Sequence, residues 1–159
     1  MFRYLIFIII FLFGCEIQST QIIKPEKFKY DVVKFNTVSK IINNEFEALS
    51  PDHEIMSEII QYWFDNRIKT NGFDGNLSVK VIQMDFNKEK KRDYYKFSIS
   101  LSLEFVEKKS STNVKKYNIN SNEYGEIVGS FAIKDQDSLD INLMHKALES
   151  ISSKLKEIN

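Results

Sequence analysis

The chain has 159 residues, of which 22 are basic and 22 acidic, so its formal net charge is zero. This length indicates one domain, at roughly 100–200 residues per domain, and 43% hydrophobic residues exclude a wholly disordered chain. The neutral charge argues against a nucleic-acid-binding protein that depends on a global positive field. One Cys and two His are too few for a disulfide framework or a typical zinc site. We therefore expect no nucleic-acid partner, no metal site and no cofactor.

The N-terminus has the composition of a secretory signal peptide. Arg3 provides the positive charge, and an apolar run from Tyr4 to Phe13 follows it. As a helix, that run would span about 15 Å, half of a hydrocarbon layer of roughly 30 Å, and the chain becomes polar from Glu16 onward. The run is therefore too short to be a transmembrane helix, and we expect residues 1–14 to be a signal peptide.

The residues Leu12-Phe13-Gly14-Cys15 resemble the lipobox of bacterial lipoproteins. This resemblance implies cleavage between Gly14 and Cys15 and attachment of acyl chains such as palmitate at Cys15. Several acyl chains anchor a protein firmly, at about 0.8 kcal/mol per buried CH₂. Two alternatives stay open. One is an ordinary secretory signal in which Cys15 is incidental, and the other is a cytosolic protein in which this run forms a buried strand.

The residues after the cysteine predict where the protein is held and how. In the sorting scheme that the lipobox resemblance implies, an Asp after the cysteine favours the inner membrane, whereas this chain has Glu16. We therefore expect the periplasmic face of the outer membrane, with the inner membrane as the alternative. Residues 15–27 are polar, contain Pro25 and lack periodicity, so they predict a tether of at most about 40 Å before a single domain over 28–159.

Hydrophobic periodicity predicts six elements in that domain. The clearest signal is the strict alternation of apolar and polar residues from Tyr95 to Phe105, which is typical of an antiparallel strand with one buried face. Ser50 and Pro51 are suited to begin a helix. In chain order, the expected elements are a strand over 28–42, a helix over 51–70, a strand over 77–86, a strand over 95–105, an interrupted strand over 114–133 and a helix over 138–157.

Finer features of the pattern complete the expected fold. Gly72 is a candidate left-handed residue at the end of the first helix. The alternation changes once within 77–86, which predicts a β-bulge, and Asn87–Asp93 is expected to be a charged hairpin tip. The last strand is expected to break around Asn122–Gly125. The order β-α-β-β-β-α predicts an α+β fold, with a four-stranded, mainly antiparallel sheet and two helices packed on one face.

Three segments of the domain carry a family resemblance. They are Trp63-Phe64-Asp65-Asn66-Arg67-Ile68 with the following Gly72, Gly75 and Leu77-Ser78-Val79, then Gly125–Ser130, and then Ala147-Leu148. Together they resemble a poorly characterised family of small alphaproteobacterial envelope lipoproteins. These are hydrophobic and turn positions, so the resemblance implies no catalytic activity. The element order also resembles LptE, the lipoprotein that plugs and assembles the lipopolysaccharide translocon, and the auxiliary lipoproteins of envelope ABC transporters.

The predicted hairpin tip is a candidate contact for an anionic partner. Lys88, Lys90, Lys91 and Arg92 make it basic. Near a charged membrane each cation would contribute about 1 kcal/mol to binding. The alternative is an ordinary solvated turn that keeps the sheet edge soluble.

Trp63 and Arg67 form a second candidate contact, because they lie one helical turn apart and both residue types are enriched at binding hot spots. The alternative is that Trp63, which falls on the apolar stripe of its helix, packs on the sheet. A polar row along the strand over 95–105 marks a solvent-facing sheet surface where a partner could also dock. This row consists of Ser98, Ser100, Ser102 and Glu104.

The remaining candidates for chemistry favour structural roles. His53 is expected at the surface in the first turn of a helix, and His145 is expected to be partly buried. Asp135 and Asp137 are interpreted as helix-capping residues because the other oxygen ligands of a calcium loop are missing. No G-x-S-x-G turn or glycine-rich phosphate loop occurs, so we expect that the protein is not an enzyme.

These features predict a non-enzymatic outer-membrane lipoprotein that acts as an accessory or assembly subunit of an envelope transport system for lipid or lipopolysaccharide. Its acyl chains would contact the membrane, and an envelope protein or an anionic lipid would be its partner. The alternative is a periplasmic binding module for a small hydrophobic or anionic lipid ligand, with a pocket between the helices and the sheet.

Overall fold

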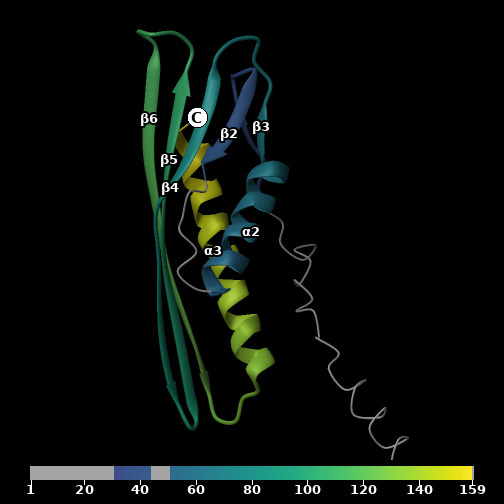
Figure 1. Ribbon diagram of the computed structural model, residues 1–159, viewed down its shortest axis with the longest axis vertical. Helices are drawn as coiled ribbons and strands as arrows, with labels where there is room; N and C mark the ends of the chain where they lie inside the picture. The colour runs from purple at the N-terminus through teal and green to yellow at the C-terminus, as the bar shows by residue number, and fades with distance from the viewer. Residues whose placement is uncertain (1–30, 44–50, 159) are drawn as a thin grey trace, which may run out of the picture.

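The computed structural model describes residues 31–43 and 51–158 and shows an α+β domain (Figure 1). This confirms the predicted fold class. The signal peptide, the acylation site Cys15 and the tether lie outside the described residues and stay predictions. The elements are β1 (Val33–Phe35), β2 (Ser39–Asn43), α2 (Pro51–Arg67), β3 (Ile68–Thr70), β4 (Asn76–Lys91), β5 (Tyr94–Lys108), β6 (Val114–Val128) and α3 (Ile133–Ile158).

A four-stranded sheet in the order β2-β4-β5-β6 forms the larger layer of the domain. Strands β4, β5 and β6 form an antiparallel meander with strand lengths of 16, 15 and 15 residues, whereas the short strand β2 is parallel to β4. Strands β1 and β3 form a separate parallel pair. Figure 1 shows α2 and α3 on one side of the long sheet, as the sequence predicts.

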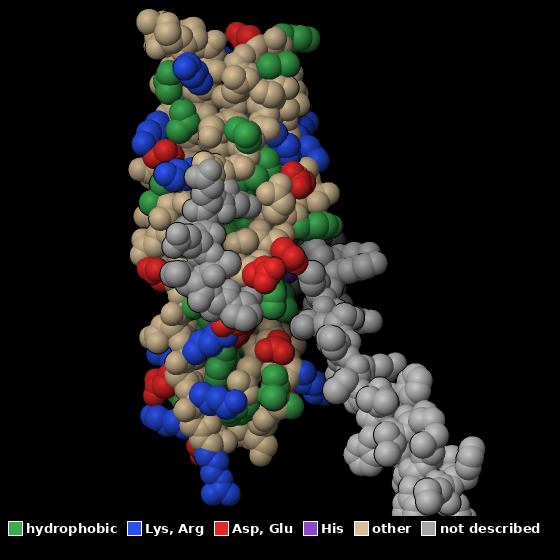
Figure 2. All heavy atoms as spheres, in the orientation of Figure 1, with side chains coloured by type: hydrophobic (Ala, Val, Ile, Leu, Met, Phe, Trp, Pro, Cys, Tyr) green, Lys and Arg blue, Asp and Glu red, His purple; other side chains and the backbone are tan. Residues whose placement is uncertain are grey.

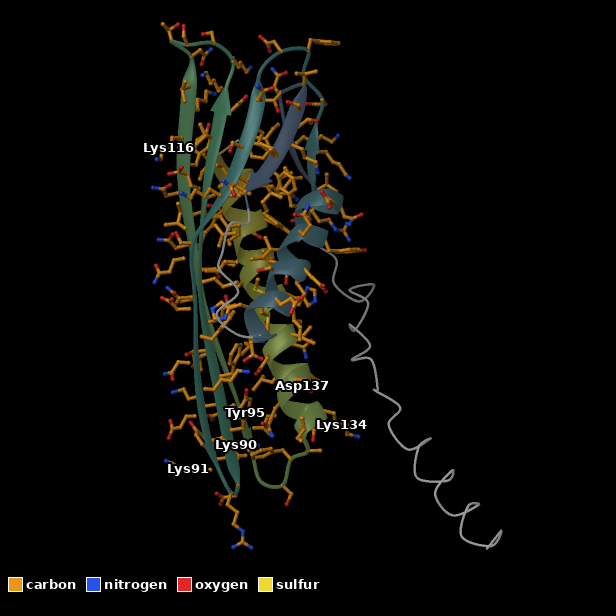
Figure 3. All side chains as sticks on the ribbon, viewed as in Figure 1. Lys90, Lys91, Tyr95, Lys116, Lys134 and Asp137 are labelled. Atoms are coloured by element: carbon orange, nitrogen blue, oxygen red, sulfur yellow. The ribbon has the colours of Figure 1, made fainter. Side chains whose placement is uncertain are left out.

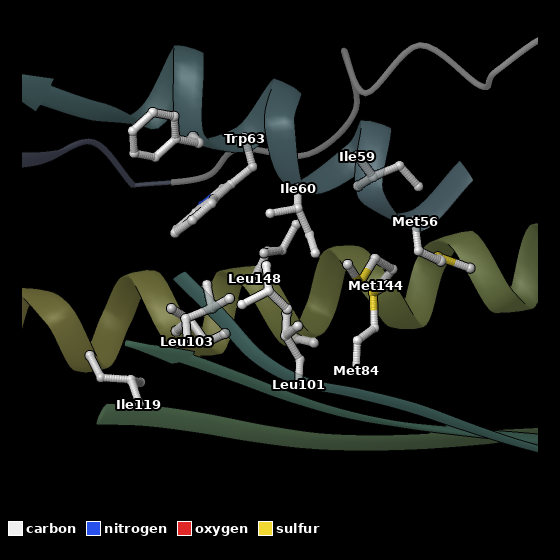
Figure 4. Packing of buried hydrophobic residues seen from close by; sticks show 14 of the residues in the cluster. Met56, Ile59, Ile60, Trp63, Met84, Leu101, Leu103, Ile119, Met144 and Leu148 are labelled. Atoms are coloured by element: carbon white, nitrogen blue, oxygen red, sulfur yellow. The ribbon is translucent and has the colours of Figure 1, made fainter. Parts of the chain in front are cut away.

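The core fills the space between the helices and the sheet. Buried side chains of α2, among them Ile60 and Trp63, lie against α3 at Leu148, and α3 in turn covers sheet residues such as Leu101 and Leu103 (Figure 4). Complete burial of such a side chain contributes about 1.5–3 kcal/mol. Hydrophobic burial therefore holds the layers together.

The predicted strand over 28–42 is divided in the structure, where only its part from residue 31 is described. Between β1 and β2 the chain bends, and the Val38 amide donates to the carbonyl oxygens of Asp74 and Gly75, at 3.2 and 3.1 Å. This bend directs β1 to β3 and β2 to β4. The prediction of one continuous strand is therefore wrong. The bend is held by the carbonyl groups of Asp74 and Gly75, which lie in a loop far along the chain, so the local sequence does not indicate it.

Helix α2 ends at Arg67, three residues before the predicted end. The Lys40 ammonium donates to the carbonyl oxygens of Phe64 and Ile68, at 2.7 and 2.6 Å, so a lysine from β2 satisfies the end of the helix. Gly72 does not adopt the predicted left-handed conformation. Instead, a Cβ atom there would lie 2.4 Å from the backbone of Asn36, so the position requires glycine for close approach of two chain segments.

The last strand and the last helix also differ from the prediction. Strand β6 is continuous through 122–125, because its regular pairing with β5 does not depend on apolar side chains. Helix α3 begins at Ile133 rather than 138, and the carboxylate of Asp135 accepts a hydrogen bond from the Ala132 amide at 2.7 Å. Asp135 therefore caps the helix from its first turn. The predicted bulge in β4 is confirmed by the register shift between Val81 and Gln83.

Candidate functional site

The sheet sorts the side chains at the end of the β4–β5 hairpin onto two faces. Buried and half-buried residues alternate along β5. Lys88 pairs with Phe97 and Lys90 with Tyr95, and the rings of Phe97 and Tyr95 are buried, so both lysines lie on the side of the helices. Figure 3 shows Lys90 and Tyr95 on that side and Lys91 on the other. The predicted group of four cations is therefore split by the sheet.

A polar cluster, made of Asp52, Lys88, Tyr95 and Asp140, lies beneath this hairpin. The Lys88 ammonium donates to Asp52 Oδ2 at 2.8 Å and lies 3.1 Å from Asp140 Oδ2. The Tyr95 hydroxyl donates to the Asp140 carboxylate and lies 2.8 and 2.9 Å from its two oxygens. The Lys88 Nζ atom also lies 5.5 Å from the centroid of the Phe97 ring. The polar cluster thus joins the start of α2, the hairpin and α3.

The pKa values in the polar cluster reflect both burial and pairing. Burial acts to lower the pKa of Lys88, but hydrogen bonds to Asp52 and Asp140 outweigh it and raise the pKa overall. Burial raises the pKa of Asp140, and the bonds from Tyr95 and Lys88 offset only part of this effect. Burial, followed by the hydrogen bond to Asp140, raises the pKa of Tyr95. Lys88 therefore stays charged and Tyr95 neutral near pH 7.

The polar cluster acts as a structural tie. Its donors and acceptors are directed at one another, and the Asp140 side chain is only 7% exposed. Removing one member would leave a buried polar group without its partner, which is costly in a low-dielectric interior. The arrangement therefore fixes the turn end of the hairpin against both helices.

The predicted hairpin tip is shorter than expected. Strand β4 continues to Lys91 and β5 begins at Tyr94, so only Arg92 and Asp93 form the turn. The prediction of a loop over 87–93 is wrong because cross-strand pairing continues through these charged residues.

The tip is also less basic than its sequence suggests. The polar cluster neutralises Lys88, so the prediction that Lys88 contacts an anionic partner is not supported by its position. Lys91 pairs with Glu89 at 2.9 Å. Lys90 and Arg92 are exposed and make no ion pair with a described residue. In Figure 2 basic side chains extend from the lower end of the molecule, where Figure 1 places this hairpin.

Trp63 is a core residue, so the prediction of a surface anchor at this position is wrong. Its side chain is 0% exposed, because the apolar stripe of α2 faces α3. The indole Nε1 donates to Ser152 Oγ at 2.9 Å, which supplies the partner that a buried indole requires. Arg67 is half-buried at the last position of α2. The two residues therefore do not form a joint binding surface.

The histidines occupy different surroundings. The His53 ring lies 4.8 Å from the Phe86 ring, measured between centroids. His145 is buried within α3, and this burial lowers its pKa to about 4. His145 is therefore neutral at physiological pH. Among residues 31–43 and 51–158, no three His, Cys, Asp or Glu side chains lie close enough together to hold a metal ion.

The outer face of the sheet, opposite the helices, is polar along its centre. Ser98, Ser100 and Ser102 of β5 are half-exposed there, which confirms the predicted solvent-facing row. The Ser102 hydroxyl donates to the side-chain oxygen of Asn120 at 2.7 Å. Glu104, also in this row, forms an ion pair with Lys116. The outer face is therefore a hydrogen-bonding surface with charges at its margins.

The space in which the sequence predicts a ligand pocket is occupied by side chains. Trp63, Leu103, Met144 and Leu148 are all buried between the helices and the sheet (Figure 4). A ligand bound between these layers would have to displace such residues.

The polar cluster was not predicted from the sequence. Its signal was present: Lys88 continues the inward positions of Met84 and Phe86, and Asp140 lies four residues before Met144 on the apolar stripe of α3. The prediction of a loop over 87–93 ends the alternation before Lys88, although β4 continues to Lys91. When two separate elements each place a charged residue at an inward position, as Lys88 and Asp140 do, the pattern indicates a buried ion pair.

The comparisons with known proteins establish no family. No family model and no curated protein matches the sequence. Among solved structures, the chain is similar to a minor lipoprotein from Acinetobacter baumannii, with a TM-score of 0.45 and 8% identity over 80% of this chain and 94% of that one. It is also similar to rare lipoprotein B from Shewanella oneidensis, with a TM-score of 0.43 and 9% identity over 76% and 95%.

A protein from Xanthomonas campestris is similar at a TM-score of 0.39 and 10% identity, over 80% of this chain and 81% of that one. Similarity at these scores is too loose to assign a family or a function. Membership of the alphaproteobacterial family stays a prediction. No helix in the described part of the chain is long and apolar enough to cross a membrane.

Proposed function

We propose that this chain is a non-enzymatic lipoprotein, held by acylated Cys15 at the periplasmic face of the outer membrane, where it serves as an accessory subunit of a lipid or lipopolysaccharide transport system. The observation that carries the proposal is the position of Cys15. It is the only cysteine in the chain and directly follows the short apolar run and Gly14. A thiol is the side chain to which a diacylglycerol can be attached through a thioether.

The described domain supports a positioning role. Many of its apolar side chains form its own core, and the polar cluster fixes the hairpin against the helices. An acyl anchor confines the domain to the membrane surface and raises its local concentration there, so that a modest contact area is enough for association. The proposed role therefore requires a docking surface rather than catalytic residues.

Two surfaces are suited to such contacts. The outer face offers hydroxyl groups from Ser98 to Ser102 for a protein partner. Lys90 and Arg92 at the hairpin end offer two cations to an anionic lipid headgroup, each contributing about 1 kcal/mol near a charged membrane. The resemblance to small alphaproteobacterial envelope lipoproteins favours a partner within the envelope.

Replacing the acylated residue tests the anchor. In Cys15→Ser, the protein should leave the membrane fraction and incorporate no radiolabelled palmitate, whereas the control Ser19→Ala in the tether should keep both properties. Glu16→Asp should move the anchored protein toward the inner membrane. If Cys15→Ser stays membrane-bound and the parent protein carries no palmitate, the proposal is overturned.

Crosslinking in intact envelopes tests the accessory role. A photo-crosslinking side chain at Ser100 on the outer face should capture a specific envelope protein, and Ser100→Arg should abolish co-purification of that protein from detergent extracts. Lys134→Glu, at an exposed position of α3 shown in Figure 3, is the matched control and should retain the partner. A chain that always purifies alone, with no protein or lipid attached, would contradict this role.

A further inference from the structure

Strand β6 is a long edge of the sheet. Its 15 residues pair with β5 on one side, and no strand among the described residues pairs with its other side. Figure 1 shows β6 at the margin of the sheet. Such an edge presents a row of backbone N–H and C=O groups and is a template for another strand.

The opposite edge combines two features that oppose pairing. Beyond Lys80, β4 has no strand partner on its free side among the described residues, but it contains a bulge between Val81 and Gln83 and ends in the charged stretch 88–91. Bulges and lysines are two common means of protecting an edge strand. The pairing of β6 with β5 shows no register shift, and β6 contains no proline. Strand β6 has lysines only near its start, and the Lys154 ammonium of α3 donates to the backbone carbonyl of Asn120 at 2.6 Å, so a pairing partner would have to share or replace that bond.

The charges along β6 are arranged in a self-complementary way. Lys115 and Lys116 lie near its start, whereas Glu123 and Glu126 lie toward its end. The residues between them include uncharged polar side chains such as that of Ser121. Antiparallel pairing of two β6 strands would place the basic part of each beside the acidic part of the other, whereas parallel pairing would place like charges together.

One register satisfies this pattern particularly well. With Ser121 of the two copies opposite each other, Lys116, which also pairs with Glu104 of its own chain, lies opposite Glu126, and the two-fold symmetry produces this pair twice. Asn118 then lies opposite Tyr124. Partners in this register occupy the same face of the sheet, so the buried face of one copy continues into that of the other.

Exposed apolar side chains on β6 support the same conclusion. Tyr124 is 72% exposed and Val128 is 74% exposed, whereas Val114 is about half exposed. Pairing with a second strand would cover part of these side chains with their cross-strand neighbours, which is where aromatic and β-branched residues stabilise a sheet.

We propose that two copies of this chain associate through antiparallel pairing of their β6 strands about Ser121. The two four-stranded sheets then form one continuous sheet, with the helices of both copies on the same side. The interface is isologous, since the same strand contributes from each copy, and it closes after two copies rather than forming a fibre.

Charge reversal tests this interface in the full acylated chain, purified in detergent and examined by sedimentation over a range of concentrations. The parent should form a dimer. Lys116→Glu and Glu126→Lys should each raise its dissociation constant by roughly tenfold or more, because each introduces two like-charge pairs. The combined K116E/E126K variant should restore dimerisation, whereas the control Lys134→Glu should leave it unchanged.

Disulfide trapping tests the register independently of charge. A mixture of the Asn120→Cys and Asn122→Cys chains should form a crosslinked pair faster than either variant alone, because these positions lie opposite each other across the proposed axis. Circular dichroism should confirm that each variant is folded. A parent that stays monomeric at all concentrations would overturn the proposal, as would a dimer that is insensitive to both charge reversals or that crosslinks no faster in the mixture.

Discussion

Two polar contacts inside the same apolar core differ in kind. Trp63 and Ser152 join α2 to α3 through one neutral hydrogen bond that is fully buried. The polar cluster joins Lys88 to Asp52 and Asp140 through charged groups, and the Lys88 side chain is 35% exposed. Charges are tolerated near the hairpin because water still reaches Lys88 and Asp52, whereas the fully buried part of the core uses a neutral pair. We therefore expect the stability lost on removing the neutral contact to be independent of pH, and the stability lost on removing the charged contact to vary with pH.

Truncation of Trp63 should have the largest effect on stability. Trp63→Ala should lower the free energy of unfolding by about 3–5 kcal/mol, because it leaves a cavity between α2 and α3. Urea denaturation measures this value. Trp63→Phe, which retains most of the buried volume, should cost much less. An equal loss in both variants would show that the indole hydrogen bond, not the volume, is decisive.

Within the polar cluster, the two carboxylates should differ in importance. Asp140→Ala should cost about 2–3 kcal/mol, because it leaves the buried Tyr95 hydroxyl without its acceptor. Asp52→Ala is the matched control. Its side chain is 46% exposed, so its loss should cost at most about 1 kcal/mol. Thermal unfolding of both variants would contradict the assigned roles if the order were reversed.

Acid should destabilise the core through His145. Its pKa falls from 6.5 in the unfolded chain to about 4 in the folded one, so between these values the unfolded state binds the proton first. The full free energy of unfolding is therefore present above pH 6.5. It falls by on the order of 1–3 kcal/mol as the pH is lowered toward 4.

Asp140 has the opposite effect on this pH dependence. Its raised pKa means that acid relieves the cost of its buried charge. The His145→Met variant therefore isolates the histidine contribution, and the slope of unfolding free energy against pH should be flatter in this variant than in the parent. Identical slopes from pH 6.5 to 4 would contradict the burial of a neutral histidine.

An effect smaller than that of Asp140→Ala is expected at the neutral contact. Ser152→Ala should cost about 1 kcal/mol, because it removes the acceptor of the Trp63 indole while leaving the ring in place. This cost should be the same at pH 5 and pH 8, whereas the cost of Asp140→Ala should vary with pH. Chemical denaturation at the two pH values separates a neutral from a charged contact.

Periodicity predicted those parts of the fold that depend on local pattern. The alternation along β5, the bulge in β4 and the apolar stripes of both helices all follow from side-chain burial, and each is present. The end of α2 could not be predicted in this way, because the lysine that satisfies its carbonyl groups comes from β2. Likewise, backbone pairing carries β6 through Asn122, where apolar side chains are sparse.

The candidate site was less predictable for the same reason. The polar cluster brings together Asp52, Lys88 and Asp140, which belong to three separate elements. The sequence pattern can show that one of these side chains points inward, but it cannot show which oppositely charged residue will pair with it. The burial of Trp63, in contrast, was predictable, because this residue lies on the apolar stripe of its own helix.

The bulge in β4 controls the phase of everything that follows it in that strand. Val81 pairs with Leu103 and Gln83 with Ser102, so Ile82 is the supernumerary residue. If β4 alternated regularly through Ile82, Lys88 would turn toward solvent and Asp140 would lose its cationic neighbour. Deleting Ile82 would instead keep every later side chain on its present face and remove the bulge. The loss of this one residue would therefore turn a protected edge strand into a regular one that is open to pairing.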